Sequence, residues 1–159
     1  MDRTGTVVHI HIAPDSGEEM VAREAVEAVA DRGIRGDRYF DEDGSRTEWG
    51  DDPDGEASDI TFIEAEAIEA VAADYGIDLD PGEPRRNVTT RDVALNHLVG
   101  ERFRVGEAVC EGRTRCEPCG YVQSLVGKGN VGEALKHRGG LDARVVESGS
   151  IECGDPIEW

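Results

Sequence analysis

The sequence lacks any long hydrophobic run, and none approaches the roughly 18–20 apolar residues that a membrane-spanning helix needs. Its first residues, Met1 to Gly5, contain neither the basic segment nor the apolar core of a secretory signal peptide. It also lacks internal repeats and an interdomain linker, and 159 residues is a typical length for one domain. We therefore expect a cytoplasmic protein without a membrane partner, forming a single domain over residues 1–159.

Positive charge is scarce, and lysine most of all. The chain has 35 acidic and 17 basic residues, a formal net charge of −18, and its only lysines are Lys128 and Lys136. Such a charge disfavours nucleic acid as a partner. An acidic, lysine-poor composition is typical of halophilic proteins, whose surface repulsion is screened by a salty cytoplasm; an ordinary acidic protein is the alternative. The acidity therefore indicates a habitat more than an activity.

Cysteine is used four times, and in a cytosolic chain these residues are expected to be thiols or metal ligands. Cys116-Glu117-Pro118-Cys119 places two thiols where they could bind one soft metal or exchange disulfides, or simply be buried. Arg113 and Arg115 nearby could favour a reactive thiolate. No second Cys-x-x-Cys follows, so a structural zinc site would need Cys110, Cys153 or histidines. The histidines lack a metal-binding spacing, and we expect His9 and His11 to be exposed.

Short elements follow one another along the chain. Thr4–Ile12 alternates as a strand with Val8, Ile10 and Ile12 on one face. The composition of Glu18–Ala30 favours a helix, although strand-like alternation is also present. A Thr61–Glu64 capping box is expected to open a helix over Glu64–Tyr75, with Ile68, Val71 and Ala72 buried and Gly76 at its end. The acidic stretch Asp41 to Asp59 lacks the ligand spacing of a calcium loop and is interpreted as a solvated surface loop.

Later elements are shorter still. We expect an extended segment over Pro84–Thr90 and a helical turn over Val93–Leu98. Strands are expected at Phe103–Val105 and Ala108–Glu111, short helices and loops from Cys119 to Leu135, and a closing strand pair at Arg144–Glu147 and Ile151–Glu158. Many short strands punctuated by 20 glycines favour a small β-barrel or sandwich with attached helices.

Arg85-Arg86-Asn87 is the second chemical signal. On an extended segment adjacent side chains point to opposite faces, so one arginine could pair with a carboxylate while the other faces a pocket. The planar fork of arginine suits phosphate or carboxylate ligands. The alternative is a pair of surface ion pairs, each of little energetic value.

The order of these signals is more specific than any one of them. In sequence come Gly33–Tyr39, Ile60–Glu64, Pro81–Val88, Leu95–Gly100, Phe103–Ala108, Cys116–Cys119, and Arg138–Gly140 through Gly154–Ile157. This series resembles the MOSC domain, the family of the C-terminal region of molybdenum cofactor sulfurases, over nearly the whole chain. The resemblance implies a mixed α/β, mainly β fold, a MOSC-type β-barrel with short flanking helices, and it makes Met20–Ala30 a strand.

The resemblance also implies a site. Its ligand is the molybdenum cofactor, a molybdopterin-type anion held by arginines, with a soft metal bound by a cysteine. Cys119 matches the functional cysteine and metal ligand, with Cys116 as its companion, and the cofactor-binding positions match Arg38, Arg85, Arg86 and Asn87. One departure is Ser16, where some cofactor-binding relatives have a lysine.

Two related activities follow from that resemblance. One is an oxidoreductase that reduces N-hydroxylated substrates, served by an electron-donor protein; the other is a sulfur carrier using a Cys119 thiolate or persulfide, served by a cysteine desulfurase. No aminotransferase-like domain is present, so we do not expect bound pyridoxal phosphate. The alternatives are a non-catalytic cofactor carrier and a structural zinc-binding domain.

Overall fold

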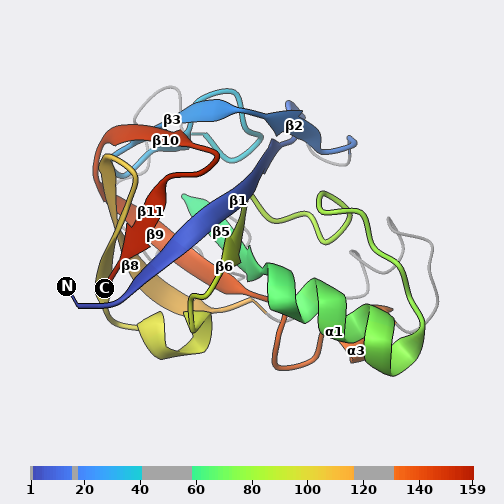
Figure 1. The fold of residues 1–159 in the computed structure, drawn as a ribbon. Helices are drawn as coiled ribbons and strands as arrows, with labels where there is room; N and C mark the ends of the chain where they lie inside the picture. The colour runs from blue at the N-terminus through green and yellow to red at the C-terminus, as the bar shows by residue number, and fades with distance from the viewer. Residues whose placement is uncertain (1, 16–17, 41–58, 117–130) are drawn as a thin grey trace.

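The computed structural model describes residues 2–15, 18–40, 59–116 and 131–159, and most of its strands form a closed barrel (Figure 1). Seven strands lie in the order β11-β7-β8-β9-β5-β6-β1, and pairing of β1 with β11 closes the ring. They are β1 (Thr4–Ile12), β5 (Ile60–Glu64), β6 (Val88–Arg91), β7 (Arg102–Val105), β8 (Ala108–Arg115), β9 (Leu141–Glu147) and β11 (Pro156–Glu158). The predicted mainly β, barrel-type fold is confirmed.

Smaller elements surround this barrel. Strand β2 (Val21–Arg23) extends the sheet beside β1, and β10 (Gly149–Glu152), β3 (Ala25–Val29) and β4 (Gly33–Ile34) form a second, three-stranded sheet. Helices α1 (Ala65–Tyr75) and α3 (Val131–Ala134) lie together at the side of the barrel away from β3 and β10 (Figure 1). A 3₁₀ turn, η1 (Leu95–Leu98), matches the predicted helical turn. None of the helices in the described ranges is long and apolar enough to cross a membrane.

Two apolar clusters stabilise these layers. The larger fills the barrel, where the Phe62 and Phe103 rings meet edge to face with centroids 5.4 Å apart. The smaller lies outside the wall, where Ile63 of β5 packs with Val71 of α1 and Val131 of α3. Side chains of β5 therefore alternate between the barrel interior and the outer, helix-covered face.

Strand β1 has the predicted bounds, but its buried face changes along its length. Val7, Ile10 and Ile12 are buried, whereas Val8 is only half-buried. The pairing of β1 with β6 shifts register between Val7 and His9, which is the signature of a bulge. The extra residue moves Val8 off the face shared by Ile10 and Ile12, so that part of the prediction is wrong.

The segment from Glu18 to Ala30 is not the helix that its composition favours. It forms β2, paired with β1 through Val21 and Ile12, and β3, paired with β10 through Ala25 and Glu152. Pairing with partner strands overrides a weak helical propensity. The strand implied by the family resemblance is correct, divided in two at Glu24.

Helix α1 is the best predicted element. It ends at Gly76, whose left-handed backbone (φ 65°) lets its N–H donate to the carbonyl of Ala72. Val71 is buried as predicted, whereas Ile68, which packs on the outer cluster, and Ala72 are only half-buried. The capping box is wrong, because Thr61 belongs to β5 and Glu64 makes no capping hydrogen bond with its side chain.

Pairing near the C-terminal end also differs from expectation. The segments predicted to form a closing pair do not pair with each other: β9 pairs with β5 and β8, β10 with β3, and β11 with β1 and β7. Strand β8 continues to Arg115, beyond the predicted Glu111. The sequence pattern correctly predicted that strands form here, but not which strands pair. The partners β3 of β10 and β1 of β11 lie far away in the chain.

Candidate functional site

Asn87 links three strands on the outer face of the barrel wall. Its side-chain oxygen accepts hydrogen bonds from the backbone N–H (3.0 Å) and the hydroxyl (3.1 Å) of Thr61 in β5. Its amide nitrogen donates to the carbonyl of His11 in β1 at 3.1 Å, and the His11 N–H donates back to the Asn87 carbonyl at 2.7 Å. Only 2% of Asn87 is exposed. The side chain of this predicted cofactor-binding residue therefore makes structural hydrogen bonds that hold the neighbouring strands together.

Arg86 connects the same segment to the glycine pair before β9. Its Nε donates to the carbonyl of Gly139 at 2.8 Å and its Nη1 to the carbonyl of Pro84 at 3.2 Å. The next carbonyl, that of Gly140, accepts the backbone N–H of Cys116 at 2.8 Å. Three separate sequence signals, the arginine pair, the glycine pair and the start of the cysteine motif, thus meet in one run of contacts.

Gly140 makes this approach possible. Its φ is +113°, and a Cβ at this position would collide with the carbonyl of Phe62 in β5. Only glycine combines that backbone conformation with so close a contact. The Gly139–Gly140 turn is therefore more than the ordinary turn that sequence reasoning suggested.

Arg85 does not lie on an extended segment. Its φ of +63° is left-handed, and the strand begins only at Val88. The predicted extended conformation is therefore wrong at Arg85, and the alternative of two surface ion pairs is wrong as well, because both arginines are buried. Arg85 Nη1 donates to the carbonyl of Glu18 at 2.8 Å, so it holds the segment that leads into β2.

Arg38 is attached to the end of β1. Its backbone N–H donates to the carbonyl of Ala13, and the Asp37 carboxylate accepts the Ala13 N–H. The guanidinium pairs with Asp37 at 3.2 Å, lies 4.5 Å from the centroid of the Tyr39 ring, and contacts Met20 sulfur at 3.5 Å. Because Ala13 is two residues beyond His11, β1 brings Arg38 to the neighbourhood of Asn87. We call Arg38, Arg85, Arg86 and Asn87 the arginine site.

His11 is the functional candidate that sequence reasoning missed. His9 is exposed as predicted, but His11 is only 8% exposed, and its Nδ1 is buried with no hydrogen-bond partner among the described residues. Burial, with a smaller contribution from His9, lowers the pKa of the His11 imidazole. The ring lies beside Gly82, where a Cβ would come within 2.9 Å of His11 Cδ2. The alternating pattern of the strand could not reveal that His11 is buried, because the residue that covers its ring, Gly82, lies far along the chain.

The cysteines occupy very different environments. Cys119 lies outside the described residues, as do Ser16 and all of the acidic stretch Asp41 to Asp59 except Asp59 itself, and Cys116 is half-buried where β8 ends. Burial raises the pKa of the Cys110 thiol, with a smaller contribution from Asp59, and also raises that of Cys153. Neither of these two thiols is suited to act as a thiolate.

The same environments bear on a structural zinc site. Cys110 lies in the barrel core, and at about 3.3 Å per strand residue it is roughly 16 Å or more along β8 from Cys116. That is too far for two ligands of one tetrahedral zinc. Across the described ranges, no group of three or more His, Cys, Asp or Glu residues could hold a metal ion.

The effect of Arg113 and Arg115 on the Cys116–Cys119 thiols stays a prediction, and the structure shows where the two arginines lie. Arg113 Nη1 lies 3.2 Å from the Asp142 carboxylate, which is itself almost wholly buried. The Arg113 guanidinium therefore forms an ion pair with Asp142. Arg115 is exposed at the end of β8.

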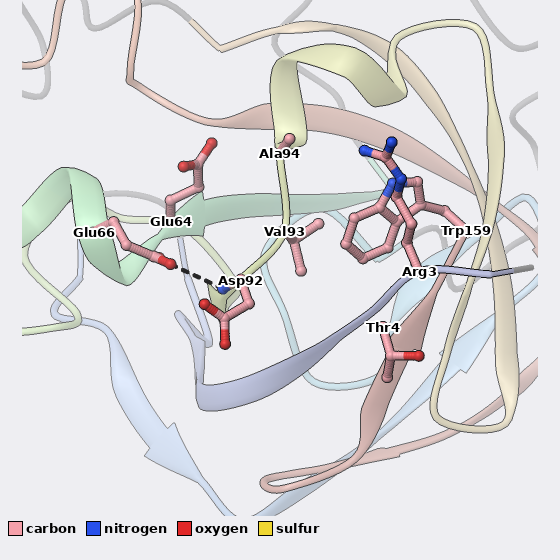
Figure 2. Close-up of a pocket in the computed structure, with 8 residues that line it drawn as sticks. All are labelled: Arg3, Thr4, Glu64, Glu66, Asp92, Val93, Ala94 and Trp159. Carbon is pink, nitrogen blue, oxygen red and sulfur yellow. Dashed lines mark hydrogen bonds between the residues drawn. The ribbon is translucent and has the colours of Figure 1, made fainter.

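An open hollow lies elsewhere, at the end of the barrel where Arg3 and Trp159 exchange backbone hydrogen bonds (Figure 2). Its volume is about 530 Å³, and we call it the acidic pocket. Glu66 accepts the Asp92 N–H at 2.8 Å and Glu64 accepts the Leu95 N–H at 3.3 Å. Burial raises the pKa of Glu64. The lining residues are Arg3, Thr4, Glu64, Glu66, Asp92, Val93, Ala94 and Trp159, none of which was predicted as a site residue.

The chemistry of the two regions differs accordingly. The guanidinium groups of Arg85 and Arg86 are buried and held by backbone carbonyls, and that of Arg38 is held by Asp37; such fixed cations suit a phosphate or carboxylate. A thiol near these groups could add a ligand for a soft metal. The acidic pocket offers carboxylates and an aromatic ring, and its charge opposes an anionic ligand.

Comparisons with known proteins agree with this description. The family model described as MOSC domain matches residues 50–158. The YuaD protein from Bacillus subtilis is similar in structure, with a TM-score of 0.78 at 20% identity over 98% of this chain and 95% of that one. YiiM from Geobacillus stearothermophilus gives 0.71 at 15% identity, over 97% of this chain and 74% of that one. YiiM from Escherichia coli gives 0.65 at 16% identity, over 97% and 68%. At these identities the likeness establishes the fold. None of the curated proteins matches the chain.

Proposed function

Because the chain belongs to the MOSC domain family, which is linked to the molybdenum cofactor, we propose that it binds a molybdopterin-type cofactor at the arginine site and acts through Cys119. The whole of residues 1–159 serves this function as one domain. The observation that carries the proposal is the contact run from Arg86 through Gly139 and Gly140 to Cys116. It anchors the start of the Cys116–Cys119 motif beside buried guanidinium groups.

The residues present fit such a group. A molybdopterin combines a phosphate, a heterocycle with several hydrogen-bonding atoms, and sulfur-bound metal. Arg38, Arg85 and Arg86 provide cations fixed by the fold, which suit the phosphate. His11 provides a buried polar atom, Nδ1, that has no hydrogen-bond partner within the described ranges. Cys116 and Cys119 provide the soft ligands that molybdenum or a transferable sulfur would need.

In the reductase form, the bound cofactor supplies oxygen-atom removal from an N-hydroxylated substrate. The chain contributes binding and orientation. Asn87 holds β1, β5 and β6 together, and Arg85 and Arg86 keep their charges in place by bonding carbonyls of Glu18, Gly139 and Pro84. Because these groups are arranged before the ligand arrives, little reorganisation is required on binding. Electrons come from a separate donor protein.

In the sulfur-carrier form, Cys119 is the group that changes. Its thiolate accepts one sulfur atom from the persulfide of a cysteine desulfurase, whose own thiolate is released. The Cys119 persulfide would then hold this sulfur for delivery to the cofactor; its release at the sulfide level would take two electrons from a thiol reductant, which becomes a disulfide, and would return Cys119 to the thiolate. Pyridoxal phosphate belongs to the desulfurase in this scheme and is not bound by this chain.

The test is metal and pterin analysis of the full chain, purified in high salt from a molybdenum-replete host. We expect about one molybdenum and one pterin per chain in the wild type. Cys119→Ala should lose the metal while keeping pterin, because the arginine site is intact. Cys153→Ala, which removes a half-buried thiol outside the motif, is the matched control and should keep both.

The outcomes separate the forms of the proposal. A reductase is supported if the loaded wild type consumes N-hydroxylated substrates with a chemical reductant. A sulfur carrier is supported by a mass increase of one sulfur on Cys119 after incubation with a desulfurase. Pterin without either activity indicates a non-catalytic carrier. Absence of both pterin and persulfide, or one equivalent of zinc instead, would overturn the proposal.

A further inference from the structure

His11 is a buried titratable side chain to which the proposed function gives no specific task. Its ring is among the buried polar side chains, and Nδ1 lacks a hydrogen-bond partner in the part of the chain that the structure describes. Buried polar atoms are almost always paired, so an orphaned one is informative about what else binds there. Its backbone, in contrast, is held on both sides by Asn87.

Position makes the ring part of the arginine site. The imidazole packs against Gly82, and a Cβ there would lie 2.9 Å from Cδ2 and 3.2 Å from Nε2 of His11. Pro84 lies two residues after Gly82 in the sequence and is followed directly by Arg85 and Arg86. The ring therefore lies between β1 and the turn that carries both buried arginines.

We propose that the His11 imidazole hydrogen-bonds the heterocycle of the pterin ligand and thereby selects that ligand over a simple phosphate-type anion; this inference rests on the proposed function. In this division of labour the arginines bind the phosphate and His11 recognises the ring. The ligand class is specific: a planar heterocycle that alternates N–H donors with nitrogen and oxygen acceptors.

The charge state of the ring agrees with this role. Burial and the neighbouring His9 lower the pKa of His11, so the imidazole is neutral near pH 7. A neutral imidazole offers one donor and one acceptor, which matches a heterocycle edge. A protonated one would instead add a fourth cation to the three arginines and would not distinguish a pterin from any other anion.

The test uses substitutions that separate the two ring nitrogens. The amide of His11→Asn falls near the position of Nδ1, that of His11→Gln falls near Nε2, and His11→Leu removes both polar atoms at similar volume. His9→Asn, two residues away on the same strand and exposed, is the matched control. Each full-length variant is purified from a molybdenum-replete host, and pterin per chain is measured by fluorescence after oxidation.

A second measurement reports on the anion and the fold separately. Thermal unfolding is followed with and without added inorganic phosphate on the cofactor-stripped proteins. We expect His11→Leu to reduce pterin per chain at least tenfold, with an unchanged phosphate-dependent shift and no loss of thermal stability. His11→Asn should retain more pterin than His11→Gln, and His9→Asn should match the wild type.

Two results would overturn the inference. If the wild type and His11→Leu carry equal pterin, His11 does not recognise the ring, while the proposed function stands. If His11→Leu loses pterin, phosphate stabilisation and thermal stability together, its role is structural. A wild type that binds phosphate but never carries pterin contradicts the proposed function itself, and this inference with it.

Discussion

The arginine site and the acidic pocket gather charge in different ways. In the arginine site, buried guanidinium groups donate to backbone carbonyls of distant segments, such as Glu18 and Gly139. In the acidic pocket, carboxylates accept backbone N–H groups, as Glu66 does from Asp92, and the hollow stays open. The two regions therefore gather charges of opposite sign around opposite backbone groups, carbonyls in one and N–H groups in the other.

This contrast shows why concavity alone does not locate the site. A charged side chain that is held in place needs hydrogen-bonding partners, and these partners occupy the space around it. A preorganised polar site can therefore lack an obvious cavity before its ligand binds. The hydrogen bonds of Arg85 and Arg86 tie their segment to residues 67 and 53 positions away, whereas Glu64 and Glu66 at the acidic pocket bond N–H groups 31 and 26 positions away. If this interpretation is correct, substitutions in the two regions should differ strongly in their effect on stability.

Gly140→Ala should have the largest effect. The new Cβ would meet the Phe62 carbonyl in a backbone conformation that already disfavours a side chain. We expect the free energy of unfolding to fall by more than about 3 kcal/mol, measured by denaturant titration. Gly154→Ala is the control, since its φ is also positive (+92°) but no atom lies within 4 Å of the added Cβ. It should cost about 1–2 kcal/mol from strain alone; equal losses in both variants would contradict a contact role for Gly140.

Asn87→Ala should come next. It leaves the Thr61 N–H and the His11 carbonyl buried without this partner, which should cost about 2–4 kcal/mol at about 1–2 kcal/mol for each of these two neutral groups. Asn96→Ala removes a similar amide bond, to the His137 carbonyl, from an exposed position and should cost less than about 1 kcal/mol. Chemical denaturation of both proteins measures the difference. A small effect at Asn87 would mean that the arginine site is not held together as described.

Glu64→Gln should have the smallest effect and the opposite sign. Burial raises the pKa of Glu64, so the folded protein holds this proton more tightly than the unfolded chain does. Stability contributed by this group is present at low pH and is lost as pH rises from about 4.5 through the raised folded value. Glutamine removes that loss while its oxygen can still accept the Leu95 N–H.

The gain should be no more than about 0.5 kcal/mol, because solvent screens a half-buried carboxyl. It should be present at neutral pH and vanish below about pH 4, where the wild-type carboxyl is protonated in both states. Thermal unfolding across this pH range tests it, with Glu107→Gln on the exposed surface as the control. A loss of stability at pH 7 would show that the negative charge itself supports the acidic pocket.

The predictable parts of the fold are those decided locally. Helix α1 and its end at Gly76 depend on residues within a few positions of one another, and they were predicted correctly. The order of motifs correctly implied strands where composition favoured a helix at 18–30. Composition could not reveal which strands pair, because pairing joins segments that are far apart in the sequence, as β10 and β3 are.

The candidate site follows the same rule. Residue types at Arg85, Arg86 and Asn87 indicated polar chemistry, but their roles depend on Gly139, Glu18 and Thr61, which are distant in sequence. The left-handed kink at Arg85 and the cover over His11 are likewise products of tertiary contact. The roles of Cys119 and Cys116 remain predictions, to be decided by the metal and persulfide measurements.

The seam between β1 and β11 has a consequence for how the protein is made. Thr4 pairs with Glu158, so nearly the whole chain separates the two strands that close the ring. During translation, β1 is synthesised before β11, and the edge of β1 that pairs with β11 stays unpaired until β11 has left the ribosome. The barrel therefore cannot close before β11 has been synthesised, and pairing between strands so far apart in the chain makes folding slow. The acidic residues that repel one another in the finished protein would also keep waiting nascent chains apart.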